Sequence, residues 1–153
     1  MVRILVTGMS GTGKTTLLAE LARRGRRVVD TDYGGYVLPE GTWDEPRIAA
    51  LLAAHEEIVV QGTVENQGRF RDRFDHIVLL SAPLEVILDR VAARTDNPYG
   101  STPADRAEIR SQHAEVEPLL RRSADLELDA LRPTAELADV LEQLLEPDPR
   151  TSR

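Results

Sequence analysis

The chain of 153 residues contains no cysteine and carries only one lysine among its 19 basic residues. Without cysteine it can form neither a disulfide framework nor a thiolate metal site. It also lacks any apolar run near the roughly 20 residues that span a membrane. The N-terminus does not show the basic-then-apolar pattern of a signal peptide. We therefore expect a cytoplasmic protein that has no membrane partner.

The charge balance is acidic, with a formal net charge of −7. A nucleic-acid-binding protein needs a basic face, so we expect no nucleic-acid partner. Basic residues do cluster at 23–27, and this cluster is interpreted as a solvated helix end that Gly25 closes. The length and the 41% of hydrophobic residues predict one domain over residues 1–146, followed by a polar tail at 147–153.

The single lysine lies in the stretch GMSGTGKT, residues 8–15, directly after the apolar run at 2–6. This is the phosphate-binding P-loop pattern in its required context of strand, glycine-rich turn and helix. Glycines let the loop curl around an anion, and backbone N–H groups then point at the phosphates. Lys14 can reach the β- and γ-phosphates, and the Thr15 hydroxyl can ligate Mg²⁺. The predicted ATP contacts are Gly8, Ser10, Gly11, Thr12, Gly13, Lys14, Thr15 and Thr16.

Short apolar runs alternate with helical periodicity along the rest of the chain. Strands are predicted at 2–7, 28–30, 58–60, 76–81 and 126–128. Helices are predicted at 13–24, 44–55, 66–74, 83–91, 103–122 and 135–145, with Thr134 as the cap of the last one. Strands that are apolar throughout indicate a parallel sheet buried on both faces. We therefore predict a three-layer α/β P-loop fold with a five-stranded parallel sheet.

Two carboxylates, Asp30 and Asp32, end the second predicted strand. In a parallel sheet they would lie beside the P-loop, and their side chains would project to opposite sides of an extended chain. One acid could then hold Mg²⁺ through water while the other accepts the proton of an acceptor hydroxyl. We assign the metal role to Asp30 and the base role to Asp32.

The order of the P-loop, a helix and a strand that ends Asp30-Thr31-Asp32 resembles the shikimate kinases, a family of nucleoside-monophosphate-kinase-like P-loop kinases. The resemblance implies ATP, Mg²⁺ and phosphoryl transfer to a hydroxyl. It also implies a lid at about 95–103, with Arg94 packed on adenine and acting in catalysis. Residues 128–133 are similar to the stretch that contacts adenine from the other side, which implies contacts from Arg132 and Pro133.

The resemblance does not extend to the acceptor site. Shikimate kinases carry three glycines after their third strand, where this chain has Gln61-Gly62-Thr63. The family arginine that grips the shikimate carboxylate falls at about Glu117 here. Shikimate is therefore not predicted as the substrate, and the oligomeric state stays open. From the residues that follow Asp32 and the third strand, the candidate acceptor contacts are Asp32, Trp43, Gln61, Gly62, Glu65 and Asn66.

Several of these candidates also have structural explanations. Glu65 or Asn66 could cap a helix, and Trp43 could pack against the helix that follows it instead of stacking on an acceptor. Four arginines that bracket the predicted lid could close onto the phosphoryl group, namely Arg90, Arg94, Arg106 and Arg110.

The sequence thus predicts an ATP-dependent small-molecule kinase. Two alternatives stay open. Aromatic residues at 33–43 would suit a nucleoside or nucleotide kinase, and an ATPase or ATP-binding switch could act with a protein partner. The fourth strand ends in Leu80-Ser81, without the acid that many P-loop ATPases use there, and this favours the kinase.

Overall fold

The computed structural model describes residues 2–9, 11–93 and 102–146. Five strands form one sheet in the order β2-β3-β1-β4-β5, and every pairing in it is parallel. The strands are β1 (Arg3–Thr7), β2 (Val28–Asp30), β3 (Ile58–Gln61), β4 (His76–Ser81) and β5 (Leu126–Asp129). The helices are α1 (Lys14–Arg23), α2 (Glu45–Ala54), the 3₁₀ helix η1 (Gln67–Arg73), α3 (Leu84–Ala92), α4 (Pro103–Ser123) and α5 (Thr134–Leu145). The predicted five-stranded parallel α/β architecture is confirmed.

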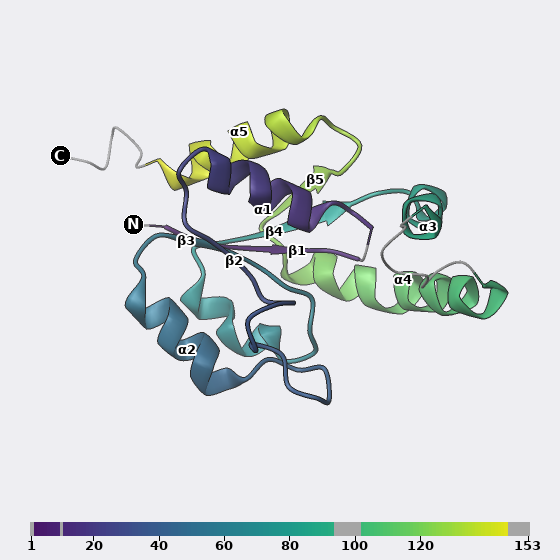
Figure 1. Cartoon of the computed structure of the whole chain (residues 1–153), viewed down its shortest axis with the longest axis horizontal. Coiled ribbons are helices and arrows are strands. Elements are labelled where there is room, and N and C mark those ends of the chain that lie inside the picture. Colours follow the sequence, from purple (N-terminus) through teal and green to yellow (C-terminus); the bar gives the residue numbers. More distant parts are fainter. Residues whose placement is uncertain (1, 10, 94–101, 147–153) are drawn as a thin grey trace.

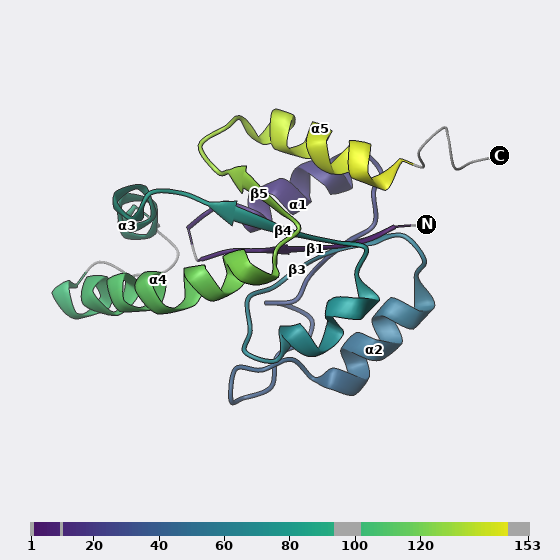
Figure 2. The same cartoon turned by 180° about the vertical axis from the view of Figure 1, so that it is seen from behind.

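The sheet separates two hydrophobic cores. Helices α1 and α5 cover one face, while α2, η1 and the C-terminal part of α4 cover the other (Figures 1 and 2). Strand residues divide between the cores by alternation: Ile4 and Val6 pack with the α1–α5 core, whereas Leu5 packs with the α2–η1 core. Because both faces are covered, the central strands are apolar throughout, as the sequence pattern indicated.

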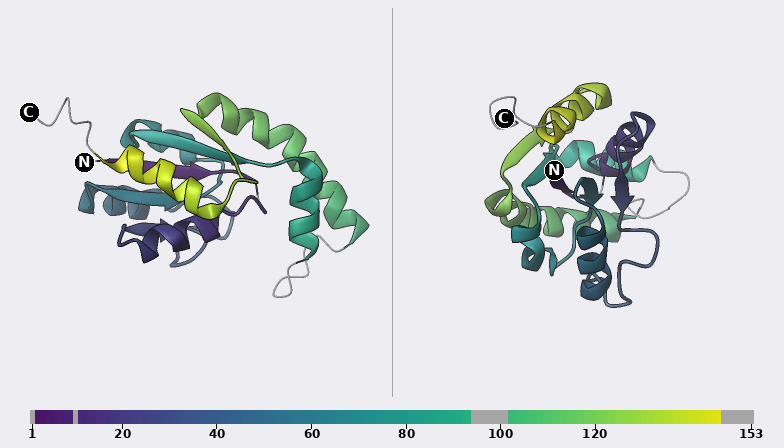
Figure 3. Two further views of the ribbon diagram at one scale, coloured as in Figure 1. Left: turned by 90° about the horizontal axis from the view of Figure 1, so that it is seen from above. Right: turned by 90° about the vertical axis from the view of Figure 1, so that its left-hand side faces the viewer.

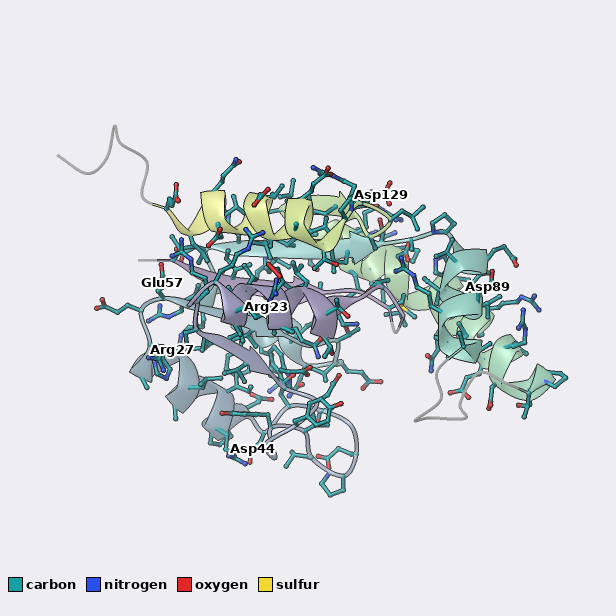
Figure 4. All side chains as sticks on the ribbon, turned by 45° about the horizontal axis from the view of Figure 1, so that its top comes forward. Arg23, Arg27, Asp44, Glu57, Asp89 and Asp129 are labelled. Atoms are coloured by element: carbon teal, nitrogen blue, oxygen red, sulfur yellow. The ribbon has the colours of Figure 1, made fainter. Side chains whose placement is uncertain are left out.

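The carboxyl ends of the strands share one edge of the sheet, and the P-loop, α3 and the N-terminal half of α4 lie beyond it (Figure 3). Figure 4 shows this polarity, because Asp129 and Asp89 lie at that end while Arg27 and Glu57 lie at the opposite end. Ligands of open parallel sheets bind at the carboxyl edge. The fold thus restricts the search for a site to one end of the molecule.

Local signals explain most element boundaries. Asp44 caps α2 by accepting a hydrogen bond from the Arg47 N–H at 3.4 Å, with proline in the first turn. Gly25 ends α1 in a Schellman motif: its N–H donates to Ala22 O, and the Arg26 N–H donates to Leu21 O. Its φ of +87° suits glycine. The predicted closure of α1 by Gly25 is confirmed.

The short helix predicted at 66–74 is confirmed and is a 3₁₀ helix over 67–73. Two other predictions about local structure are wrong. Thr134 is the first residue of α5, not its cap, and Pro133 precedes it without a side-chain cap. Arg24 and Arg26 are not simply solvated, because Arg24 donates to Asp139 and Glu142 of α5 and Arg26 also binds Glu142. These hydrogen bonds, first from Arg24 and then from Arg26, lower the pKa of Glu142.

None of the helices within the described ranges combines the length and apolar character needed to cross a bilayer. Ser10, Arg94 and most of the predicted lid at 95–103 lie outside the described residues. The predictions made for them therefore stay predictions.

Candidate functional site

The P-loop wraps the N-terminus of α1 at the end of β1. Gly11 and Gly13 adopt φ angles of +87° and +89°, in the left-handed region where a Cβ is strained. A Cβ on Gly13 would meet no atom within 4 Å, so open space lies over the first turn of α1. A Cβ on Gly8 would come within 2.4 Å of Leu80 O. The glycines therefore serve the backbone conformation at Gly13 and close packing at Gly8.

Lys14, at the first position of α1, lies over the loop. Its ammonium donates to Gly8 O at 2.5 Å and to Met9 O at 3.2 Å. Thr12 is buried, and its hydroxyl also donates to Met9 O, at 2.8 Å. The loop carbonyls and the Thr12 hydroxyl thus hold the loop closed on itself. The lysine charge and the N-terminus of α1 meet on one side, as an anion site requires.

A chain of polar contacts joins α1 to the ends of β2 and β3. The Thr15 hydroxyl donates to Asp30 Oδ2 at 2.9 Å. The side-chain amide of Gln61 donates to Asp30 Oδ1 at 2.5 Å and to Asp32 Oδ2 at 3.0 Å. Gln61 is fully buried, so this two-pronged donor fixes both carboxylates relative to the sheet. The structure therefore brings Thr15, Asp30 and Asp32 together, as the sequence predicted.

The Thr15–Asp30 pair has the donor chemistry that Mg²⁺ prefers. Mg²⁺ in kinases is held by one or two protein oxygens, with substrate phosphates and waters completing the octahedron. A hydroxyl and a carboxylate 2.9 Å apart beside the P-loop fit this pattern. No cluster of three or more His, Asp or Glu side chains suited to a metal occurs within 2–9, 11–93 and 102–146. Thr15 and Asp30 therefore fit a metal ion that binds together with a nucleotide, whose phosphates supply further ligands.

Two side chains that the sequence analysis did not select support the P-loop from β3 and η1. Thr63 accepts from the Gly8 N–H at 3.2 Å and donates to Gly8 O at 2.6 Å. Gln67 is buried and donates to the Thr7 hydroxyl at 3.1 Å, which itself lies 3.1 Å from the Thr63 hydroxyl. Thr63 could have been found once β3 was placed next to β1, because both strands then end at the same point.

Two hollows meet at the P-loop. The larger, which we call the acceptor cleft, has a volume of about 700 Å³. It is lined by Gly8, Met9, Lys14, Asp32, Glu40, Gly41, Gln61, Thr63, Val64, Glu65, Gln67, Gly68, Gln112, Val116, Leu119, Leu120 and Ser123. The smaller, which we call the nucleotide pocket, has a volume of about 370 Å³. It is lined by Gly11, Thr12, Gly13, Thr16, Arg90, Ala130, Arg132, Pro133, Thr134 and Leu137.

The nucleotide pocket contains residues that the family resemblance selected. Arg132 and Pro133, taken as adenine contacts, line it together with Thr16 of α1. Of the four arginines considered for the lid, Arg90 of α3 lines the same pocket and donates to Gly11 O at 3.2 Å. Arg90 thus connects the pocket wall to the P-loop.

Trp43 and Gly62 serve the core beneath the cleft. Trp43 is 1% exposed and meets the Phe70 ring edge-on at 5.8 Å, so of its two predicted roles the structure shows packing. Its indole N–H donates to Thr31 Oγ1 at 3.0 Å. A Cβ on Gly62 would approach Trp43 Cζ2 and Thr31 Oγ1 to 2.7 Å. Gly62 therefore lets the Trp43 side chain approach the backbone closely. Trp43 and Gly62 pack against each other, and neither lines the acceptor cleft.

The remaining candidate acceptor residues differ in placement. Asn66 binds the backbone of Trp43 on both sides, accepting at 2.9 Å and donating at 3.0 Å, and it does not cap η1 by its side chain. Asn66 is thus a structural link outside the cleft lining. Glu65 and Gln61 line the acceptor cleft. Glu117, at the position of the family arginine, is buried against Arg121 and His113 and does not line the cleft.

Comparisons with known proteins agree with this geometry. A family model described as an AAA domain matches residues 4–111, from β1 into α4. The chain belongs to this AAA domain family. The match covers the P-loop and both carboxylates of the AAA-domain site described above. No curated protein matches the sequence.

Solved structures similar to this AAA-domain protein include kinases of small molecules. A shikimate kinase from Acinetobacter baumannii has a TM-score of 0.67 at 23% identity, with 94% of this chain and 92% of that chain covered. One from Bacteroides thetaiotaomicron has a TM-score of 0.70 at 21% identity, covering 95% and 99%. A gluconokinase from Sinorhizobium meliloti has a TM-score of 0.64 at 21% identity, covering 94% and 93%. The predicted resemblance to the shikimate kinases is confirmed at the level of the fold.

Proposed function

We propose that the protein is an ATP- and Mg²⁺-dependent kinase that phosphorylates a hydroxyl group of a small molecule. The observation that carries the proposal is the position of Asp32. It lies in the wall of the acceptor cleft together with Lys14, while the Gln61 amide holds it beside the Thr15–Asp30 pair. Under the proposal, a general base, a phosphate-binding lysine and a pair of metal-ligand oxygens thus lie together beside the P-loop.

The residues divide the work of phosphoryl transfer. The P-loop N–H groups and Lys14 bind the β- and γ-phosphates and stabilise charge on the transferring group. Thr15 and Asp30 would hold Mg²⁺, which would neutralise phosphate charge. Asp32 accepts the proton of the acceptor hydroxyl while the hydroxyl oxygen forms a bond to the γ-phosphorus. The bond from that phosphorus to the β–γ bridging oxygen breaks, and ADP leaves.

The nucleotide pocket supports ATP as the phosphoryl donor. It opens beside Gly11 and Gly13, and Arg132 and Pro133 lie in its wall. An arginine plane and a proline ring both offer flat or apolar surface on which an aromatic base can pack. Under the proposal the adenine occupies this pocket, and the triphosphate extends along the P-loop toward the acceptor cleft.

The alternatives fit the site less well. A nucleobase in the acceptor cleft would need stacking partners, but Trp43 is buried and Arg47 covers Tyr36 at 4.9 Å from the ring centroid. Among the described residues that line the cleft, none is aromatic. For a partner-driven ATPase, β4 should end in a metal-binding acid, yet Ser81 there donates to Glu127 at 2.7 Å.

The proposal is tested by ADP formation from Mg-ATP, with and without nucleosides, nucleotides, sugars, cyclitols and hydroxy acids. A kinase releases ADP faster with one acceptor class and forms a phosphorylated product that mass spectrometry detects. Slow hydrolysis that no acceptor changes, with tight ATP binding, would instead indicate the ATPase or switch.

A further inference from the structure

The acceptor cleft of this chain is acidic, whereas shikimate, the substrate of the kinases that this chain resembles, itself carries a carboxylate. Asp32, Glu40 and Glu65 line it, and Lys14 is the one lysine or arginine in its described lining. None of the three carboxylates forms an ion pair with a described residue. Lys14 serves the phosphates under the proposed function. Apart from Lys14, the charged side chains in the described lining of the cleft therefore offer an acceptor negative charge.

Two arginines on the elements around the cleft have partners outside it, although the chain is rich in arginine. Arg69 on η1 pairs with Glu45 of α2 at 3.3 Å. Arg47 donates to Gly35 O at 2.8 Å and lies over Tyr36. Neither side chain lines the cleft. A carboxylate or phosphate on the acceptor would therefore meet like charge without a described guanidinium to offset it.

A second observation points to a ligand that donates hydrogen bonds. Gln61 lines the cleft and is fully buried, and its amide nitrogen donates to both Asp30 and Asp32. Turning the amide over would place its oxygen against two carboxylates, so its orientation is fixed. The other atom, Oε1, has no hydrogen-bond partner among the described residues. A buried oxygen without a hydrogen-bond donor costs folding free energy, and a ligand rich in N–H or O–H donors would supply the missing hydrogen bond.

Helix α4 gives the cleft apolar surface. It contributes Val116, Leu119 and Leu120, beside the polar Gln112 and Ser123, and Leu119 is 58% exposed despite its size. An acceptor that lies against α4 would cover the leucine with its own apolar surface. The cleft thus combines carboxylates with exposed apolar surface.

We propose that the acceptor is a cationic amino alcohol: a hydroxyl-bearing molecule with an ammonium group that faces Glu40 and Glu65 and an apolar portion that covers Leu119. This inference rests on the proposed kinase function and adds the substrate class. Asp32 remains the base for the hydroxyl, while the ammonium group donates to the carboxylates and the Gln61 oxygen.

The experiment uses matched acceptors that share a sugar, cyclitol or aryl-propanediol skeleton and differ in one substituent, an ammonium, a hydroxyl or a carboxylate. For the sugar skeleton the probes are 6-amino-6-deoxyglucose, glucose and glucuronate, which differ only at C6. Phosphoryl transfer is followed by ADP release, and binding is followed separately by calorimetry on the Mg-ADP-loaded enzyme. The variants are Glu65→Gln, Glu65→Lys and the control Glu56→Gln. Glu56 is exposed beside Glu57, at the far end of the molecule in Figure 4.

We expect the ammonium member of each phosphorylated set to have a kcat/KM at least tenfold above its neutral counterpart. In Glu65→Gln this ratio should fall by about tenfold, and in Glu65→Lys the preference should move toward the carboxylate member. Glu56→Gln should keep the ratio of the natural enzyme. Preference for the neutral or carboxylate member in the natural enzyme, or a ratio that Glu65→Gln leaves intact, would overturn the inference.

The binding measurement separates this inference from the kinase proposal. If Mg-ATP binds but no acceptor is phosphorylated, the kinase proposal fails. Ammonium compounds that still bind, and that lose affinity in Glu65→Gln, would then support a cation-binding cleft on its own. Binding without charge preference would overturn it.

Discussion

The nucleotide side and the acceptor side of the site are built from different kinds of residues. The nucleotide side is a continuous motif, with glycine conformations and helix-terminal N–H groups that any triphosphate requires. The acceptor side is assembled from β2, β3, η1 and α4, whose lining residues lie far apart in sequence. Backbone geometry determines the nucleotide side, whereas the identity of the side chains that line the cleft determines the acceptor side. Substitutions should therefore affect the two sides in separable ways.

The largest effect is expected from Lys14→Ala on the nucleotide side. Losing the ammonium removes charge stabilisation from the transferring phosphoryl group, and kcat should fall roughly a thousandfold. The fold should persist, since the core does not depend on this side chain. Steady-state kinetics and circular dichroism check both statements. Arg27→Ala, an exposed cation at the opposite end of the sheet (Figure 4), should leave kcat unchanged.

Asp32→Asn should affect the acceptor side alone. An amide cannot take the hydroxyl proton, so kcat should fall by about 10²–10³-fold, while ATP affinity measured by calorimetry stays within about twofold. Asp72→Asn removes an exposed carboxylate on η1 and serves as the control. Full activity of Asp32→Asn would remove Asp32 from the role of base.

Gly62→Ala distinguishes a packing role from an acceptor role. The added Cβ would come within 2.7 Å of Trp43, and overpacking of this kind costs roughly 1–3 kcal/mol of unfolding free energy. Thermal melting should show a lower Tm. Gly68→Ala is the matched control, because a Cβ there meets nothing within 4 Å and should not change the Tm. Raised acceptor KM with a normal Tm would return Gly62 to the acceptor site.

The smallest effect is expected from Glu127→Gln, which loosens the link between α4 and β5. Hydrogen bonds from Arg121 and then Ser81 lower the pKa of Glu127 below its ordinary 4.5. Its stabilising contribution is therefore present above pH 4.5 and is lost as the pH falls through the lowered pKa. The Tm difference between variant and natural protein should be measurable at pH 7 and become smaller as the pH falls below 4.5. A difference that grows as the pH falls would contradict this.

The nucleotide side was largely predictable from sequence because its signals are local. The P-loop spacing, the strand at β2 and the Asp30–Asp32 pair each need only neighbouring residues and the rule that parallel strands end at one edge. The pairing of Thr15 with Asp30 then follows from the fold.

The acceptor side was less predictable because its residues acquire meaning only from three-dimensional neighbours. Trp43 and Gly62 look like ligand contacts until their mutual packing is known. Gln61 was selected for an acceptor, but its two-pronged contact with the carboxylates depends on β3 lying beside β2. Glu117 stands in the sequence where the family has an arginine, but in the structure its side chain does not line the cleft.

The length of α4 has a consequence for how the two substrates influence each other. Within one helix, Val116 and Leu119 face the acceptor cleft, while Arg121 binds Glu127 of β5 at 2.7 Å. The chain after β5 leads directly to Arg132 and Pro133 in the nucleotide pocket. We expect a shift of α4 that strengthens acceptor binding to move Arg132 and Pro133 in the nucleotide pocket as well. The affinities for the acceptor and for ATP should therefore be thermodynamically linked. We expect substrate synergism: the Kd for ATP falls when the acceptor is present, by the same factor as the Kd for the acceptor falls with ATP.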